Sequence, residues 1–254
     1  MTHLFGFTLT TVEAAMAGRA LGTDLRRFPL DPPALPADPA RLAAVLRIVI
    51  DDLAARRLSV AGELNPHVRQ AIRLFGSARV SVGLAGARFR LLGLTDGRDA
   101  VTVRQQGDEL SFECYDDEDI VAVLVGELPA APRCTGPAEV RVPVTPDRGA
   151  EHDDEFFGSS PVAAGGWTTA RREPDSAALL LSGTHREAGF AAVDGVGRAG
   201  ARVTGRRLSW VDTDHGRYLV EQAGNAVVYT AADQTGLARV LRAAVDDVQF
   251  AGVR

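Results

Sequence analysis

The stretch VTVRQQGDELSFECYDDEDIVAVLVGEL (101–128) has the pattern of two strands, a tight turn and a helix, and it recurs as YLVEQAGNAVVYTAADQTGLARVLRAAV (218–245). The two copies align without a gap and share six identities over 28 positions. Gly107 and Gly224 fall at the same place, where a tight hairpin turn requires the positive φ that glycine supplies. We therefore expect two similar halves related by pseudo-twofold symmetry, each with a hairpin followed by a helix packed on a sheet.

Helix starts are predicted from capping residues followed by apolar side chains at helical spacing. Asp116 and Asp233 stand at equivalent positions of the repeat, and each is predicted to cap the helix that follows it. Asp38 with Pro39, and Asn65 with Pro66, predict two more helix starts in the first half. The expected inward-facing residues of these helices, in chain order, are Leu42, Val45, Leu46, Val49 and Leu53; Val68, Ile72 and Phe75; Ile120, Val123 and Leu124; Leu237, Val240, Leu241, Ala244, Val245 and Val248.

Alternating apolar residues and turn signals predict strands between these helices. In the clearest of them Leu110, Phe112 and Cys114 share one face. Asp96-Gly97 marks the turn before the hairpin of the first copy, as the segment 213–216 does for the second. The strands are predicted over 87–94, 99–105, 109–115, 187–194, 201–212, 217–222 and 226–231. The predicted fold class is therefore α+β, with an antiparallel sheet and flanking helices.

Composition excludes several classes of protein. The chain has 254 residues, a formal net charge of −5, two cysteines and no lysine. An acidic balance disfavours general nucleic-acid binding, and two cysteines cannot form a disulfide scaffold. Apolar runs are shorter than a membrane-spanning helix needs, and the N-terminus lacks the pattern of a secretory signal. We therefore expect a cytoplasmic protein without membrane insertion.

One long segment shows no helical or strand period. Residues 144–173 contain the acidic run Glu151–Glu155, with His152 inside it, followed by a Gly- and Ala-rich stretch. Such a segment is predicted to be mobile, because it offers too little apolar surface to offset the entropy of ordering. We expect a single domain, 1–254, with an N-terminal half 1–143 and a C-terminal half 174–254.

No motif in this sequence strongly indicates a catalytic, cofactor-binding or metal-binding site. Gly195, Gly197 and Gly200 spell GxGxxG, but a strand pattern follows where a dinucleotide site needs a helix, so we interpret them as a hairpin turn. Asp212, Asp214 and His215 lie at the tip of another predicted hairpin, where such residues favour turn geometry. Other possible ligands are equally isolated: Cys114 lies on an apolar strand face, and Cys134 belongs to no CxxC motif. We predict no catalytic, cofactor-binding or metal-binding residues.

The segment RRLSWVDTDHGRYL (206–219) resembles the W-x-D-T-x-x-G-R-Y pattern of the EspG family, cytosolic chaperones of ESX (type VII) secretion systems. RRFPLDPP (26–33), DDLAARRLSVAGELNP (51–66) and DDEDIVAVLVGELP (116–129) agree with that family in outline and in order. The matching residues of the specific segment are Trp210, Asp212, Thr213, Gly216, Arg217 and Tyr218.

The resemblance implies an EspG-like fold with pseudo-twofold halves. It also implies a chaperone that binds helical ESX substrates such as PE–PPE pairs and keeps them soluble for export, without catalysis or a cofactor. We expect Arg202, Arg206 and Arg207 to contact the partner, because planar guanidinium groups suit interfaces. Two alternatives stay open: a metal-dependent or hydrolytic enzyme using His215 and nearby acids, and a structural homodimer that acts as a scaffold. The sequence does not identify the partner, the contact residues, the oligomeric state or the role of 144–173.

Overall fold

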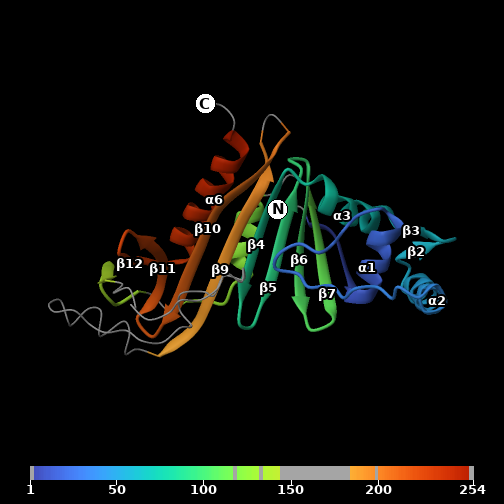
Figure 1. The fold of residues 1–254 in the computed structure, drawn as a ribbon, viewed down its shortest axis with the longest axis horizontal. Helices are drawn as coiled ribbons and strands as arrows, with labels where there is room; N and C mark the ends of the chain where they lie inside the picture. Colours follow the sequence, from blue (N-terminus) through green and yellow to red (C-terminus); the bar gives the residue numbers. More distant parts are fainter. Residues whose placement is uncertain (1–2, 117–118, 132–133, 144–183, 198–199, 252–254) are drawn as a thin grey trace, which may run out of the picture. The chain divides into compact units, whose positions relative to one another are not determined.

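A computed structural model (Figure 1) describes residues 3–116, 119–131, 134–143, 184–197 and 200–251 of the chain. The segment expected to be mobile, 144–173, lies outside the described residues. The chain forms two compact units, each assembled from separate stretches of sequence. Unit 1 comprises Met1–Ala130, Glu187–Leu208 and Gln234–Arg254, and unit 2 comprises Ala131–Arg186 and Ser209–Asp233. The division into halves 1–143 and 174–254 stays a prediction.

Unit 1 is a sheet with helices on both faces. Its strand order is β1-β7-β6-β5-β4-β9-β10, and the pairs whose register is described are antiparallel. Its elements in chain order are β1 (His3–Thr10), α1 (Thr11–Ala20), α2 (Pro39–Ala55), β2 (Ser59–Val60), β3 (Glu63–Leu64), α3 (Pro66–Ser77), β4 (Val80–Gly86), β5 (Arg90–Thr95), β6 (Asp99–Gln106), β7 (Glu109–Asp116), α4 (Ile120–Gly126), most of β9 (His185–Val196), the first part of β10 (Arg202–Thr213) and α6 (Gln234–Phe250).

The two faces of this sheet have different covers. Leu92 and Phe112 belong to a core that also includes Ile72 and Phe75 of α3. On the opposite face α4 lies against β5, where a Cβ added to Gly93 would meet Ile120. Helix α6 lies on that same face, against β4. Strand alternation explains the arrangement, because successive residues of β5 point to opposite faces.

Unit 2 is smaller and consists of strands in the order β10-β11-β12-β8. It contains the end of β10, β11 (Gly216–Ala223), β12 (Ala226–Ala232) and β8 (Glu139–Pro143), all paired antiparallel. A core of buried valines and tyrosines holds them together, made of Val140, Val142, Val211, Tyr218, Val220, Val227 and Tyr229. The predicted α+β class, with an antiparallel sheet and flanking helices, is confirmed.

The internal repeat is confirmed in its element order and in its strand register. Gly107 connects β6 to β7 with a φ of +58°, and Gly224 connects β11 to β12 with a φ of +61°. Gln106 faces Glu109 in the first hairpin, and Ala223 faces Ala226 at the same positions of the second. A helix then follows each hairpin.

The prediction that Asp116 caps a helix is wrong. Asp116 is the last residue of β7 and pairs with Asp99 of β6, so its backbone is extended. The N-cap of α4 is Asp119, whose carboxylate accepts hydrogen bonds from the backbone N–H groups of Val121 (3.1 Å) and Ala122 (3.2 Å). Asp116 and Asp119 both fit the capping pattern. Because Asp116 is paired within the sheet, Asp119 is the residue left to cap the helix.

The other predicted helices begin where expected. Helix α2 starts at Pro39, and the carboxylate of Asp38 accepts a hydrogen bond of 2.9 Å from the N–H of Arg41. Asn65 caps α3, and α6 begins directly after Asp233. The predicted inward stripe of α2 is only partly correct: Val49 and Leu53 are buried, whereas Leu46 is 40% exposed.

Several elements were missing from the prediction, and one began too early. The elements not predicted are β1, α1, β2, β3, β4 and β8. The strand expected over 87–94 corresponds to β5, which begins only at Arg90, since β4 ends at Gly86 and the Gly86 N–H donates to Phe89 O (3.0 Å) across the turn between them. Residues 87–89 therefore form a connection rather than part of a strand.

Candidate functional site

The acidic residues at the β10–β11 tip have structural partners. Asp212 and Arg217 face each other in the ladder, and both side chains are almost fully buried. Arg217 donates from Nε to Oδ1 (2.7 Å) and from Nη2 to Oδ2 (2.8 Å) of that carboxylate. Two parallel hydrogen bonds between a guanidinium and a carboxylate are among the strongest side-chain contacts in proteins. The expectation that Asp212 and Arg217 are structural therefore agrees with their geometry.

The two remaining residues of the alternative enzyme site are also held by the turn. Asp214 is exposed and accepts a hydrogen bond of 2.7 Å from Arg186, and that hydrogen bond holds the pKa of Asp214 below its ordinary value. The backbone N–H of His215 donates to Thr213 Oγ1 (3.1 Å). The Asp214 carboxylate thus serves a surface ion pair, and the His215 backbone serves the turn.

The sequence segment that carried the family resemblance lies in this same hairpin. Trp210, Arg217 and Tyr218 are among the largest fully buried side chains of the chain. The Arg217 guanidinium lies 5.8 Å from the centroid of the Trp210 ring, within the range of a cation–π contact. Gly216 has a φ of +120°, and a Cβ there would come within 2.6 Å of the Cα of Cys134. The segment is therefore a packed structural hairpin rather than a set of exposed contact residues.

The predicted partner residues lie on β10 in unit 1. Arg202, Arg206 and Arg207 are all exposed. A Cβ added to Gly205 would meet Val248 of α6, so Gly205 and its alternate neighbour Arg207 point toward the α6 face. Arg202 and Arg206 point to the opposite face. Arg202 and Arg206 thus lie on one face of the sheet, and Arg207 lies on the other.

Aromatic side chains lie on the Arg202 side of the sheet. The loop after α1 places Phe28 over β4, because a Cβ at Gly83 would meet its ring at 2.7 Å. The Phe28 ring meets the ring of Phe190 from β9 edge to face, at 5.5 Å between centroids. Phe28 remains 43% exposed. We call the surface made by Arg27, Phe28, Phe190, Arg202 and Arg206 the arginine face.

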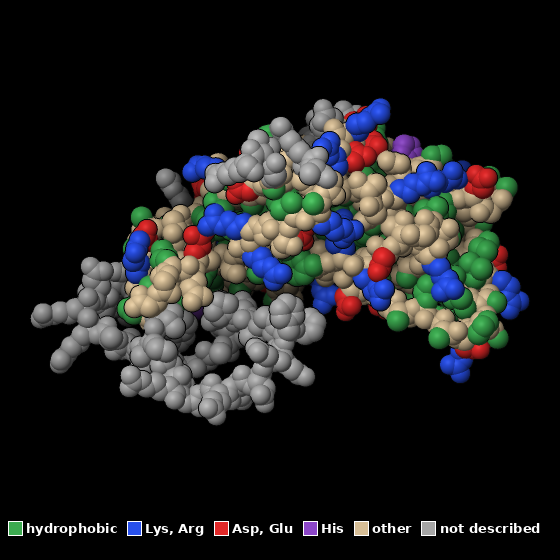
Figure 2. Space-filling model, turned by 45° about the horizontal axis from the view of Figure 1, so that its top comes forward, with side chains coloured by type: hydrophobic (Ala, Val, Ile, Leu, Met, Phe, Trp, Pro, Cys, Tyr) green, Lys and Arg blue, Asp and Glu red, His purple; other side chains and the backbone are tan. Residues whose placement is uncertain are grey.

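A second exposed apolar area lies on α2 and β2. Leu46 is 40%, Ile48 61%, Ile50 44% and Val60 71% exposed. Leu46 and Ile50 lie one helical turn apart on the same side of α2, and we call these two residues the α2 patch. Figure 2 shows hydrophobic side chains grouped at its right-hand end, the end at which Figure 1 places α2 and β2. Exposed apolar side chains that lie close together are unusual on a surface that contacts only water.

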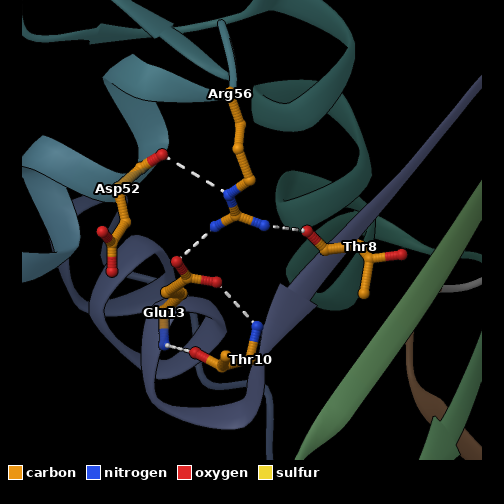
Figure 3. Close-up of polar contacts among 5 residues, drawn as sticks. All are labelled: Thr8, Thr10, Glu13, Asp52 and Arg56. Carbon is orange, nitrogen blue, oxygen red and sulfur yellow. Dashed lines mark hydrogen bonds and ion pairs between the residues drawn. The ribbon is translucent and has the colours of Figure 1, made fainter.

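Figure 3 shows a polar cluster that sequence reasoning missed. Thr10 and Glu13 form a capping box at the start of α1: the Glu13 N–H donates to Thr10 Oγ1 (3.1 Å), and the Thr10 N–H donates to Glu13 Oε2 (2.7 Å). Arg56, at the end of α2, forms an ion pair with the buried Glu13 carboxylate and donates to Thr8 O (2.8 Å). The T-x-x-E pattern at Thr10 was the available signal. The cluster joins α2 to β1 and α1, so its role is structural.

The remaining sequence candidates have plain structural roles. β9 ends at Val196 and β10 begins at Arg202, and the Gly197 N–H donates to Ala201 O (2.9 Å), which confirms the hairpin at the GxGxxG segment. Cys114 is buried on β7, and burial raises the pKa of its thiol to about 11, as expected of a core residue. Its thiol therefore stays protonated at neutral pH.

The described residues hold neither a metal-binding cluster nor a membrane-spanning helix. No three His, Cys, Asp or Glu side chains of the described ranges come together as a metal ion would need. A shallow depression of about 210 Å³ in unit 1 is lined by residues that include Arg79, Asp96 and Phe250. None of the described helices combines the length and apolar character that crossing a membrane requires.

The sequence matches the EspG family over residues 10–243. The chain belongs to the EspG family. One solved structure with the same fold is that of the Mycobacterium tuberculosis type VII secretion system chaperone EspG5 in complex with a PE25–PPE41 dimer. The two chains align over 98% of each, with a TM-score of 0.60 and 14% sequence identity. A comparison with curated protein sequences gives no match.

The EspG assignment confirms the resemblance and the fold that it implied. In this EspG protein the most recognisable residues, Trp210 to Tyr218, are buried in one hairpin. They identify the family because they specify the fold. The exposed arginine face and the α2 patch depend on residues outside that segment.

Proposed function

We propose that this EspG protein is a cytosolic chaperone that binds helical type VII secretion substrates of the PE–PPE kind and keeps them soluble for export. The observation that carries the proposal is the family match over 10–243, together with a shared fold with EspG5, whose structure contains a PE25–PPE41 dimer. Long helical substrates expose apolar tips, and a chaperone needs a surface able to cover one of them.

The arginine face is the surface of this chain that best supports the proposal. It combines an exposed aromatic ring, Phe28, with the exposed arginines Arg202 and Arg206. Aromatic residues and arginine are enriched in protein interfaces, because both bury a large area while arginine also makes oriented hydrogen bonds. We propose that Arg202 and Arg206 contact the partner directly, and that Arg207 contributes from the α6 side.

We propose further that the chain performs no catalysis and needs no cofactor or metal. The residues that an enzyme would use at the β10–β11 tip are engaged otherwise: Asp212 with Arg217, and Asp214 with Arg186. A general base must lie within hydrogen-bond reach of a reacting group, and these acids are directed at arginines instead.

The test is to express the tagged chain in its own host and identify what copurifies with it. We expect a helical PE–PPE pair at an equal molar ratio, and a loss of that pair from the soluble fraction when the chain is deleted. Recovery of the chain alone, or with a small molecule at an equal molar ratio, would contradict the proposal.

The α2 patch supports a second candidate, a homodimeric scaffold. Two copies could cover Leu46 and Ile50, which share one side of α2, by pairing their α2 helices. Sedimentation of the wild type and of Ile50→Glu distinguishes the two functions: a wild-type dimer that the substitution converts to a monomer favours the scaffold, and a wild-type monomer favours the chaperone.

A further inference from the structure

Part of the Arg27 guanidinium is buried without a hydrogen-bond partner in the described structure. Arg27 lies in the loop between α1 and α2, where its carbonyl accepts a hydrogen bond of 2.8 Å from Leu30 N. Its side chain is half-buried, and its Nη1 is shielded from solvent with no hydrogen-bond partner among the described residues. Removing part of a guanidinium from water without replacing its hydrogen bonds costs free energy.

The two neighbouring charges act on Arg27 in opposite directions. Burial lowers the pKa of Arg27, and the positive charge of Arg202 lowers it further. The negative charge of Asp194 on β9 acts in the opposite direction, but no hydrogen bond from Arg27 to Asp194 is made within the described structure. Two positive charges thus share one surface with a single acid near them.

An aromatic pair lies beside this group on the arginine face. Phe28 follows Arg27 in the chain, and its ring lies against the half-buried Phe190 at 5.5 Å between centroids. A charged contact beside the exposed Phe28 ring is shielded from water once a partner covers that ring, which strengthens the attraction between opposite charges. Phosphate and carboxylate both fit a guanidinium fork, but the exposed Phe28 ring favours an anion carried on an apolar protein surface.

We propose that Arg27 and Arg202 form a carboxylate-binding site on the arginine face, and that its ligand is an aspartate or glutamate on the helical tip of the secretion partner. The proposal rests on the proposed chaperone function and adds the chemistry that selects the partner. The carboxylate of the partner accepts hydrogen bonds from both guanidinium groups, and an apolar side chain beside it covers Phe28.

The first experiment asks whether the site binds a carboxylate at all. The probe is N-acetyl-glutamate N-methylamide, which carries one side-chain carboxylate, and the matched neutral probe is N-acetyl-glutamine N-methylamide. We expect the acidic probe to shift the NMR resonance of the Arg27 Nε–H and to saturate, and the neutral probe to leave it unmoved. Equal shifts with both probes, or a shift with inorganic phosphate but not with the acidic probe, would overturn the carboxylate assignment.

The second experiment asks whether the partner uses the site. The variant is Arg27→Met, which keeps the length of the side chain, and the control is Arg26→Met, which removes an exposed arginine paired only with Asp24. We expect Arg27→Met to reduce recovery of the PE–PPE pair at least tenfold and Arg26→Met to leave it within twofold. Equal recovery with both variants would overturn the site and leave the chaperone function standing. No PE–PPE pair with the wild type would count against the function itself.

A stability measurement separates a binding role from a structural one. Because Arg27→Met removes a cation that is partly buried and unpaired, we expect the Tm of the free protein to rise by about 2 °C. If the variant instead unfolds, Arg27→Lys keeps the charge but loses the planar fork, and it should lower partner recovery without changing Tm. A fall in Tm with both variants would show that Arg27 stabilises the fold, and would overturn the proposal.

Discussion

The β5–β6 and β10–β11 hairpins, which stand at equivalent places before the two repeat hairpins, share a register but differ in what they bury. Thr95 of β5 faces Ala100 of β6, and at the same cross-strand position of the second hairpin Asp212 faces Arg217. Two residues before Thr95 is Gly93, and two residues before Asp212 is Trp210. The register fixes which positions face each other, but it does not fix which residue types occupy those positions.

The cause of the difference is how closely a helix approaches each site. Helix α4 comes so near β5 that a Cβ on Gly93 would lie 2.5 Å from Ile120 Cγ1. At Trp210 a large ring and the guanidinium of Arg217 fill the space instead. One hairpin is therefore stabilised by close helix packing, and the other by a buried ion pair.

The largest effect is expected from breaking the ion pair. Arg217→Met leaves the Asp212 carboxylate buried without its guanidinium partner, and this should lower the free energy of unfolding by roughly 3–5 kcal/mol. Urea denaturation followed by tryptophan fluorescence measures it. The control, Arg186→Met, removes the partner of the exposed Asp214 and should move the midpoint little.

A double variant refines this test. Asp212→Thr with Arg217→Met gives the second hairpin a neutral pair like that of the first, so part of the lost stability should return. A double variant as unstable as Arg217→Met alone would show that an unpaired charge is not the cause.

The next largest loss of stability is expected where α4 packs closely on β5. Gly93→Ala places a methyl group against Ile120 and Leu124, and overpacking of this kind costs about 1–3 kcal/mol. Gly126→Ala, where a Cβ meets nothing within 4 Å, is the matched control and should change stability by less than about 0.5 kcal/mol. Equal losses from both would mean that α4 moves away freely.

Replacing either turn glycine with alanine should lower stability by the same amount, and by less than Gly93→Ala does. Gly107 and Gly224 have φ values of +58° and +61°, so alanine at either position costs roughly 1–2 kcal/mol. Neither Cβ would meet a neighbour within 4 Å, so conformation alone sets the cost. Thermal denaturation of the two single variants should agree within about 0.5 kcal/mol, and a clear inequality would mean that the turns are alike only in backbone angle.

The smallest effect distinguishes the two acidic residues before α4. Asp119→Ala removes the N-cap and should cost about 1 kcal/mol, whereas Asp116→Ala at the end of β7 should cost less than half of that. The helical circular dichroism signal and the Tm of each variant provide the measurement. The reverse order would restore Asp116 as the cap and bring the helix starts of the two copies back into line.

Features that depend on neighbouring residues were predictable from the sequence. The turn glycines, the alternation of Leu110, Phe112 and Cys114, and the helix starts at Pro39 and Pro66 all follow from local backbone preferences. The α+β class followed from adding these together. The family then followed from the Trp210–Tyr218 segment.

Features that depend on distant residues were not predictable. Arg56 lies 43 residues from Glu13, and nothing near either one indicates their pairing. Arg27 is half-buried because its loop packs across the sheet. Hydrophobic periodicity in the sequence does not predict such packing. Sequence reasoning selected Arg202 because planar guanidinium groups suit interfaces, and missed Arg27 because nothing in the RRFPLDPP segment indicates that its guanidinium is partly buried.

The contacts around Arg56 also bear on how this protein avoids aggregation. β1 is the outermost strand of unit 1, and such a strand offers unpaired backbone groups to the strands of other chains. The Thr8 carbonyl and the Thr10 N–H, which a foreign strand would need, are occupied by Arg56 and Glu13. One end of the open sheet edge is thus closed to strand addition by the same side chains that anchor α1 and α2.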